Sequence, residues 1–169
     1  MVDIQTRWLG EAVRVADLLA GDLYFAGTGG EHLCIAVVAD GADYALVLSG
    51  PPLHGGTATG LDMVYRDKLP PKVVQRLTGG VFVLEPIGRG WASGGGGVTG
   101  GAGSGALGLV DQQVTIYFSD AQDRVLFDLR TGREAAPKAG TLWFPSWRLG
   151  WRFGDEEREL VRVGLADGA

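Results

Sequence analysis

The residues best suited to metal binding or acid–base chemistry are few in this chain of 169 residues. They are two histidines, His32 and His54, and one cysteine, Cys34. His32 and Cys34 stand two residues apart, so on a strand their side chains would face the same way, and both types can bind metal ions. Two ligands do not make a metal site, and the sequence has no second Cys/His pair to complete one. We therefore expect a packed strand at this position and no bound metal.

The polar cluster that could support catalysis surrounds His54. Two glycines follow this histidine, as in the oxyanion loops of esterases, and Thr57, Thr59 and Asp62 are close in sequence. The esterase fold also needs a serine in a G-x-S-x-G turn between a strand and a helix, and the chain contains no such motif. We therefore predict no catalytic residue. The alternative is a pocket near residues 51–60, with His54 as its base and Asp62 as a second polar group.

Aromatic residues concentrate near the C-terminal end. Trp143, Trp147 and Trp151 are four residues apart, which is a helical spacing, but Pro145 and Gly150 disfavour a helix. A strand has a period of two instead. One face of such a strand would carry Trp147, Leu149, Trp151 and Phe153.

An aromatic face of this kind can be buried core, a protein interface or a platform on which sugars stack. Protein interfaces are enriched in aromatic residues and arginine. The candidate binding residues are therefore Trp143, Trp147, Arg148 and Trp151. Carbohydrate binding would require at least two of the three tryptophans to be exposed and coplanar, so burial of all three would remove that hypothesis.

Two further motifs have simpler explanations. Residues 103–108 fit G-x-G-x-x-G by letter, but a dinucleotide site needs this motif between a strand and a helix, and here it precedes a predicted strand. No Walker A sequence is present. Pairs of aspartates at residues 40 and 43 and at residues 120 and 123 lack EF-hand spacing and suit turns. We therefore expect no cofactor.

Composition indicates an ordinary globular chain, with 46% hydrophobic and 21% charged residues. The net charge is −5 and the basic residues are scattered, so we expect no nucleic-acid partner. No apolar run is long enough for a membrane span, and the first residues do not resemble a signal peptide. A single cysteine excludes an internal disulfide. These features predict a soluble, cytoplasmic protein.

Glycine is the compositional outlier, with 29 residues in the chain. Because glycine favours turns, this predicts many turns joining many short strands. We predict one all-β domain over residues 1–169, a sandwich or partly open barrel of about eight to ten short antiparallel strands, with at most one short N-terminal helix.

Hydrophobic patterns place the strands. The continuous apolar run at 32–39 predicts a central strand. The other predicted strands cover 44–49, 61–66, 81–87, 113–119, 124–130, 147–153 and 160–165. Residues 6–20 have helical spacing, and the alternative for this segment is a strand at 12–15, a helical turn at 17–20 and a strand from residue 22. Pro70 and Pro71 could begin a further helical turn that ends at Leu77.

A glycine-rich segment interrupts this pattern at residues 88–108. It holds 11 of the 29 glycines, and no residue from 90 to 110 is charged. We predict a long loop between two strands, which in a compact domain is usually functional or disordered.

These observations favour a non-catalytic interaction or structural module, such as a subunit of a larger assembly, whose partner is another protein or a second copy of the chain. One alternative is a small-molecule-binding domain or hydrolase with a pocket near residues 51–60. The other is a carbohydrate-binding module that uses its tryptophans.

Overall fold

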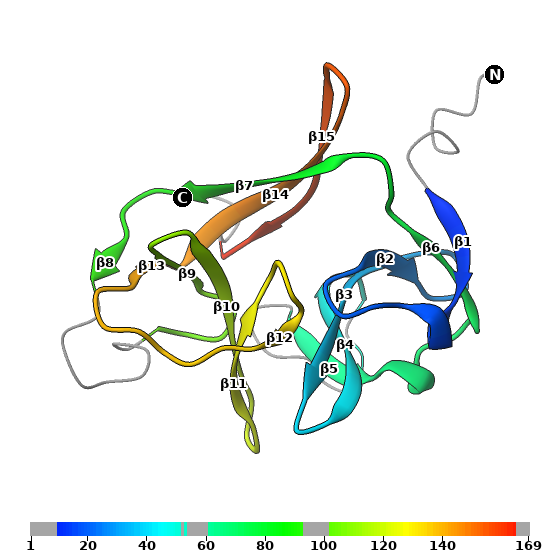
Figure 1. Cartoon of the computed structure of the whole chain (residues 1–169), viewed down its shortest axis with the longest axis horizontal. Coiled ribbons are helices and arrows are strands. Elements are labelled where there is room, and N and C mark those ends of the chain that lie inside the picture. Colours follow the sequence, from blue (N-terminus) through cyan, green and yellow to red (C-terminus); the bar gives the residue numbers. More distant parts are fainter. Residues whose placement is uncertain (1–9, 52, 54–60, 93–101, 165–169) are drawn as a thin grey trace.

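Short strands joined by tight turns make up nearly all of the regular structure (Figure 1). The structure is a computed structural model that describes residues 10–51, 53, 61–92 and 102–164. Fifteen strands and two 3₁₀ helices of three residues each lie in these ranges. The predicted all-β class is confirmed. The strands outnumber the expected eight to ten because several, such as the two-residue β8 and β12, are too short for their alternation to register in sequence.

The first half of the chain contains two 3₁₀ helices, η1 (Val15–Asp17) and η2 (Arg66–Lys68). Its strands are β1 (Glu11–Arg14), β2 (Leu23–Ala26), β3 (His32–Ala39), β4 (Ala42–Ser49), β5 (Asp62–Tyr65) and β6 (Val73–Arg76). The strands of the second half are β7 (Val81–Ile87), β8 (Trp91–Ala92), β9 (Leu107–Val110), β10 (Gln113–Ser119), β11 (Arg124–Asp128), β12 (Arg133–Glu134), β13 (Leu142–Phe144), β14 (Ser146–Phe153) and β15 (Glu156–Val163).

The strands form two sheets that do not close into a barrel. The larger sheet has twelve strands in the order β1-β6-β2-β3-β12-β11-β10-β9-β13-β8, with β4 paired to β3 and β5 paired to β4. Its two halves meet where Arg133 of β12 pairs in parallel with Val38 of β3. The smaller sheet has the order β15-β14-β7. The chain passes between the sheets before and after β7, and again at Pro145, which separates β13 from β14.

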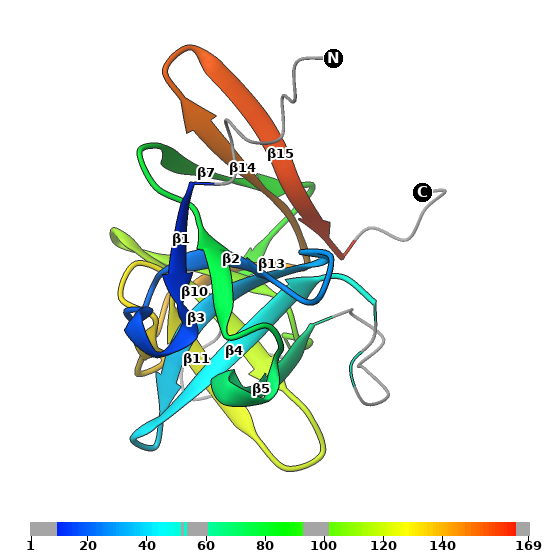
Figure 2. The same ribbon diagram turned by 90° about the vertical axis from the view of Figure 1, so that its right-hand side faces the viewer.

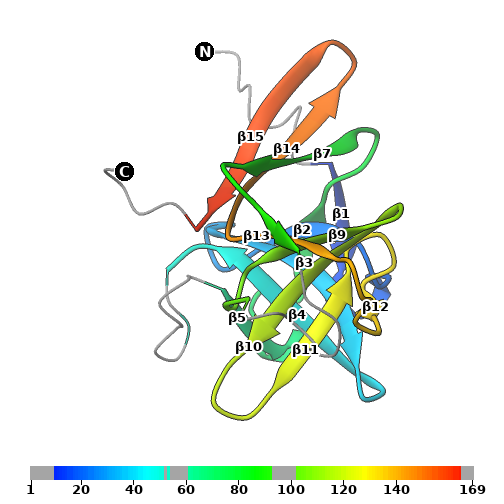
Figure 3. The same cartoon turned by 90° about the vertical axis from the view of Figure 1, so that its left-hand side faces the viewer.

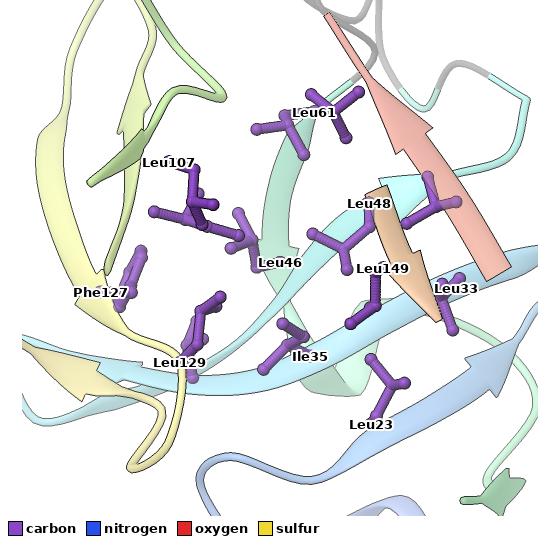
Figure 4. Close-up of a cluster of buried hydrophobic side chains, with 14 of the residues drawn as sticks. Leu23, Leu33, Ile35, Leu46, Leu48, Leu61, Leu107, Phe127, Leu129 and Leu149 are labelled. Atoms are coloured by element: carbon purple, nitrogen blue, oxygen red, sulfur yellow. The ribbon is translucent and has the colours of Figure 1, made fainter. Parts of the chain in front are cut away.

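Strand β3 is buried on both faces, as its continuous apolar run predicts. Leu33, Ile35 and Val37 point into the main core, which residues from β9, β10, β11, β14 and β15 complete. Figure 4 shows Leu107 of β9 and Leu149 of β14 converging there with Leu46 of the adjacent strand β4.

The opposite face of β3 meets a second, smaller core. Cys34 and Ala36 lie there beside Ala26 and Ala45 of the neighbouring strands. These small side chains leave room for the chain at the two 3₁₀ helices to pack against this face, and Leu18, Leu69 and Val74 fill the remaining space.

Two helix predictions are wrong for the described residues. From Gly10 onward the proposed N-terminal helix is instead β1, the 3₁₀ turn η1 and then β2, so the strand–turn–strand alternative was the better interpretation. The predicted helical turn after Pro70 is the strand β6. In both places the valines favour extended backbone, and antiparallel pairing between β1 and β6 supplies the hydrogen bonds that a helix would have supplied locally.

The smaller sheet stands away from the rest of the molecule. In Figures 1, 2 and 3 the β14–β15 hairpin extends beyond the other strands, with β7 along its flank. This sheet contributes Trp147, Leu149, Trp151, Val161 and Val163 to the main core, whereas Val81, Phe82 and Phe153 at its far end are exposed. Its free end is therefore open to solvent or to a partner.

The glycine-rich segment contains the short strand β8 and the start of β9, which sequence patterns did not predict. Trp91 of β8 pairs with Trp143 of β13, and Leu107 and Gly108 belong to β9. Residues 93–101 lie outside the described ranges. The letters that fit a dinucleotide motif lead into β9, a strand and not a helix, so the structural context of a pyrophosphate site is missing.

Candidate interaction surface

The three tryptophans proposed for binding are buried and belong to two separate clusters. Trp147 and Trp151 pack from β14 into the main core, whereas Trp143 lies on β13 in the larger sheet with Tyr117. None of the three exposes more than 4% of its surface. The indole N–H of Trp147 is also engaged, donating a 2.8 Å hydrogen bond to the carbonyl oxygen of Gly105. They offer no stacking platform, so the carbohydrate-binding hypothesis does not meet its condition.

Arg148, the fourth predicted binding residue, lies on the outer face of the smaller sheet among carboxylates of the same protein. It forms a hydrogen-bonded ion pair with Glu85 of β7, and its Nη1 lies 3.3 Å from Glu157 and 3.8 Å from Glu159 of β15. The hydrogen bond to Glu85 is the main reason why the pKa of Arg148 is raised. Arg148 therefore links all three strands of the sheet, and its charge is already matched.

The proposed catalytic cluster is only partly described. His54, Thr57 and Thr59 lie outside the described residues. Asp62 begins β5 and is half-buried, and its Oδ1 accepts a 2.9 Å hydrogen bond from the N–H of Met63. Its Oδ2 is buried and has no hydrogen-bond partner among the described residues, and the catalytic alternative stays a prediction.

His32 and Cys34 lie packed in β3, as the sequence predicts. Their exposed fractions are 5% and 0%. The described residues contain no group of three or more His, Cys, Asp or Glu side chains placed to hold a metal ion.

The smaller sheet has two edges of opposite character. Among the described strands β15 and β7 each pair with β14 alone. Five of the eight residues of β15 are charged, namely Glu156, Glu157, Arg158, Glu159 and Arg162. By contrast β7 carries one charge, that of Glu85, and Arg148 binds it. Charged side chains and proline protect an edge strand from pairing with another chain, so β15 is protected along most of its length, whereas β7 has only Glu85 and Pro86 near one end.

Pro86 indicates which backbone groups of β7 face its open edge. Proline cannot donate a hydrogen bond, so it fits in a sheet where its nitrogen points away from the neighbouring strand. The backbone groups of residues two apart point the same way in a strand. We infer that the N–H and C=O groups of Phe82 and Leu84 face the open edge, where they form a short row of donors and acceptors.

Exposed apolar side chains gather at the free end of this sheet. Val81, Phe82 and Phe153 expose 61%, 39% and 41% of their surfaces. Phe82 lies opposite Trp151 across the β7–β14 pair, with ring centroids 4.9 Å apart and planes tilted by 54°. Clustered exposed aromatic residues mark contact surfaces more often than isolated ones do.

A cleft of about 540 Å³ separates this free end from the body of the molecule. Trp151, Arg158 and Leu160 form the wall on the side of the smaller sheet. Phe25, Val73 and the glycines of the β2–β3 turn form the opposite wall. The cleft therefore continues the apolar surface of Phe82 and Phe153 towards the body.

The residue types most often linked to metal binding and acid–base chemistry, histidine and cysteine, are absent from β7. The useful signal was the run Val-Phe-Val-Leu at 81–84, which has no charge and ends before Glu85 and Pro86. A central strand would bury such a run on both faces. The position of β7 at the edge of its sheet depends on pairing with β14, a strand far away in the sequence.

No helix in the described part of the chain has the length and apolar character needed to cross a membrane. Comparison of the sequence and structure with protein-family models, curated proteins and solved structures finds no match.

Proposed function

We propose that this protein is a non-catalytic structural module that assembles with a second copy of itself through the open edge of β7. The observation that carries the proposal is the difference between the two edges of one sheet, since β15 is densely charged and β7 is almost wholly apolar. An open apolar edge is a template for strand addition.

The sequence of β7 suits antiparallel pairing with itself. With Val83 on the two-fold axis, Phe82 of one copy lies opposite Leu84 of the other, and Val81 lies opposite Glu85. This register brings an aromatic ring against an aliphatic side chain and keeps the two Glu85 carboxylates apart, and both features favour a cross-strand pair. In this register the outward-facing N–H and C=O groups of Phe82 in one copy lie opposite those of Leu84 in the other, so hydrogen bonds can join them.

Pairing of two β7 strands leaves no β7 edge open, so this pairing ends at two copies. Two copies would form a continuous six-stranded sheet in the order β15-β14-β7-β7-β14-β15. Both outer edges would then be the charged β15 strands, which resist further addition. A two-fold contact of this kind gives a dimer and not a fibre. The dimer would be the building unit of any larger assembly. A single buried thiol, Cys34, is compatible with assembly in a reducing cytoplasm.

Amide hydrogen exchange as a function of protein concentration tests this surface residue by residue. Pairing at β7 predicts that the amides of Phe82 and Leu84 exchange more slowly at high concentration. The outward-facing amides of β15 serve as the internal control and should exchange at the same rate throughout. Equal exchange of Phe82 and Leu84 at low and high concentration would contradict assembly through β7.

A further inference from the structure

A buried arginine with unmatched donors lies on the side of the molecule away from the projecting sheet. Arg66 begins η2, directly after β5, and exposes only 5% of its surface. Its Nη1 donates a 2.9 Å hydrogen bond to the carbonyl oxygen of Leu18, at the end of η1. In Figure 2 β5 lies near the bottom of the molecule, whereas the β14–β15 hairpin is at the top. The arginine is therefore remote from the proposed dimer surface.

The rest of this guanidinium group is poorly satisfied. Neither Nε nor Nη2 has a hydrogen-bond acceptor among the described residues. The nearest carboxylate oxygen, Oδ1 of Asp43, lies 3.5 Å from Nη2, too far for a strong hydrogen bond. The hydroxyl group of Tyr24, on β2, is also buried and has no hydrogen-bond partner among the described residues. Buried charges normally have their donors filled, because leaving them empty costs free energy.

The two empty donors have the geometry of an anion receptor. Nε and Nη2 lie on the same edge of the planar guanidinium group. That edge presents two parallel N–H bonds, which fit the two oxygens of a carboxylate or a phosphate. The third nitrogen is held by Leu18, so the group is fixed in orientation before any ligand arrives.

Arg66 also lines a cavity of about 650 Å³, a volume typical of small-molecule sites. Lys72 adds positive charge to its walls and Asp43 and Asp67 add negative charge, whereas Arg14 already pairs with Asp17 at 2.8 Å. The apolar part of the lining comes from Val15, Ala16, Tyr65, Leu69 and Val73. The Tyr65 ring stacks on Tyr44 at 4.7 Å, which fixes an aromatic surface at the wall.

We propose that this cavity binds a small organic oxyanion, whose carboxylate or phosphate group pairs with Nε and Nη2 of Arg66 and whose apolar body lies against Tyr65 and Leu69. Nε and Nη2 are buried in the unliganded chain, so the ligand must displace Asp43, whose side chain is 66% exposed. Asp43 is thus an internal anion that occupies part of the site when no ligand is bound.

Nuclear magnetic resonance of arginine Nε–H groups tests this proposal on the full chain. The probes are benzoate and phenyl phosphate, which distinguish the two oxyanions, and benzyl alcohol, which carries no charge. A saturable shift of the Arg66 Nε–H signal with at least one of the two anions is expected, and no shift with benzyl alcohol. The absence of an Arg66 shift with both anions would overturn the proposal.

Three variants distinguish specific binding at Arg66 from a general effect of the protein's charge on anion binding. Asp43→Asn removes the internal anion and should tighten binding by about two- to fivefold. Asp40→Asn changes the charge by the same amount in the adjacent turn, outside the cavity lining, and should leave the affinity unchanged. Arg66→Lys keeps the charge but loses the paired donors, so binding should weaken by about tenfold or more in a protein whose backbone spectrum is retained. Equal effects of the two aspartate variants would overturn the proposal, as would full binding by Arg66→Lys.

Discussion

Gly80 lies directly against the indole ring of Trp151. A Cβ atom at residue 80 would come 2.5 Å from Cε2 of the ring and 2.6 Å from the carbonyl oxygen of Arg152. The other flank of Trp151 faces Phe82, so the ring cannot move away freely. The absence of a side chain at residue 80 therefore allows the start of β7 to approach β14 closely and to cover the tryptophan.

Replacing this glycine should destabilise the protein. Gly80→Ala forces either the ring or the β7 backbone to shift, and overpacking of this kind costs about 1–3 kcal/mol. Chemical denaturation followed by tryptophan fluorescence measures the change. Gly103→Ala is the matched control, because a Cβ atom there meets nothing within 4 Å, and its effect should stay within about 0.5 kcal/mol. Equal stabilities of the two variants would show that Trp151 does not constrain residue 80.

The stability of the protein should fall in alkaline solution partly because of Cys34. Burial raises the pKa of this thiol from its ordinary 9.0 to about 12. Between these values the unfolded chain loses a proton that the folded chain keeps, so the free energy of unfolding decreases as the pH rises. Below pH 9 the thiol is protonated in both states and contributes no pH dependence.

Cys34→Ala removes this titration and provides the test. The difference in free energy of unfolding between wild type and variant should be constant below pH 9, then shift against the wild type as the pH rises further. Denaturation curves at neutral pH and at about pH 10.5 are sufficient. The same difference at both pH values would contradict a thiol that stays protonated in the fold.

The carboxylates of the projecting sheet should show the opposite dependence. Arg162 donates hydrogen bonds of 3.1 and 2.8 Å to the two carboxylate oxygens of Glu159, and these bonds are the main reason why the pKa of Glu159 is lowered. A lowered pKa contributes stability above the ordinary value of 4.5, and this contribution is lost as the pH falls through the folded-state value.

Arg162→Gln should raise the pKa of Glu159 towards its ordinary value. A carbon-detected resonance titration of the Glu159 carboxyl group measures this directly. Arg124→Gln removes an equal charge from an exposed position on β11 and should leave the Glu159 titration unchanged. An unchanged titration in Arg162→Gln would mean that the pair does not form in solution.

Local patterns predicted the strands whose register is fixed by nearby residues. The apolar run at 32–39 and the hairpin of β10 and β11, turned at residues 120–123, both follow from adjacent signals. The N-terminal segment had helical spacing, yet its partner β6 lies about sixty residues away, and pairing between them decides its structure. Sequence patterns contain no record of that contact.

The site was harder to predict than the fold. Tryptophan and arginine suggested a binding site at residues 143, 147, 148 and 151. In the structure the three tryptophan rings are buried in two hydrophobic clusters, and Arg148 is paired with carboxylates of β7 and β15. Phe82 and Arg66 attracted no attention because neither stands in a motif. The roles proposed for them rest on a sheet edge unpaired among the described strands and on unmatched donors beside a cavity, which only the folded chain creates.

The central claim, assembly of two copies through β7, is tested most directly by the solution mass from light scattering between about 1 and 300 µM protein. The prediction is a concentration-dependent rise to twice the mass of one chain, and no further. Val83→Lys, which places a charge at the centre of the proposed contact, should remain a monomer throughout this range. Gln112→Lys adds the same charge in the exposed β9–β10 turn and should dimerise like the wild type. A wild-type protein that stays monomeric at every concentration, or a Val83→Lys variant that dimerises equally well, would contradict the account.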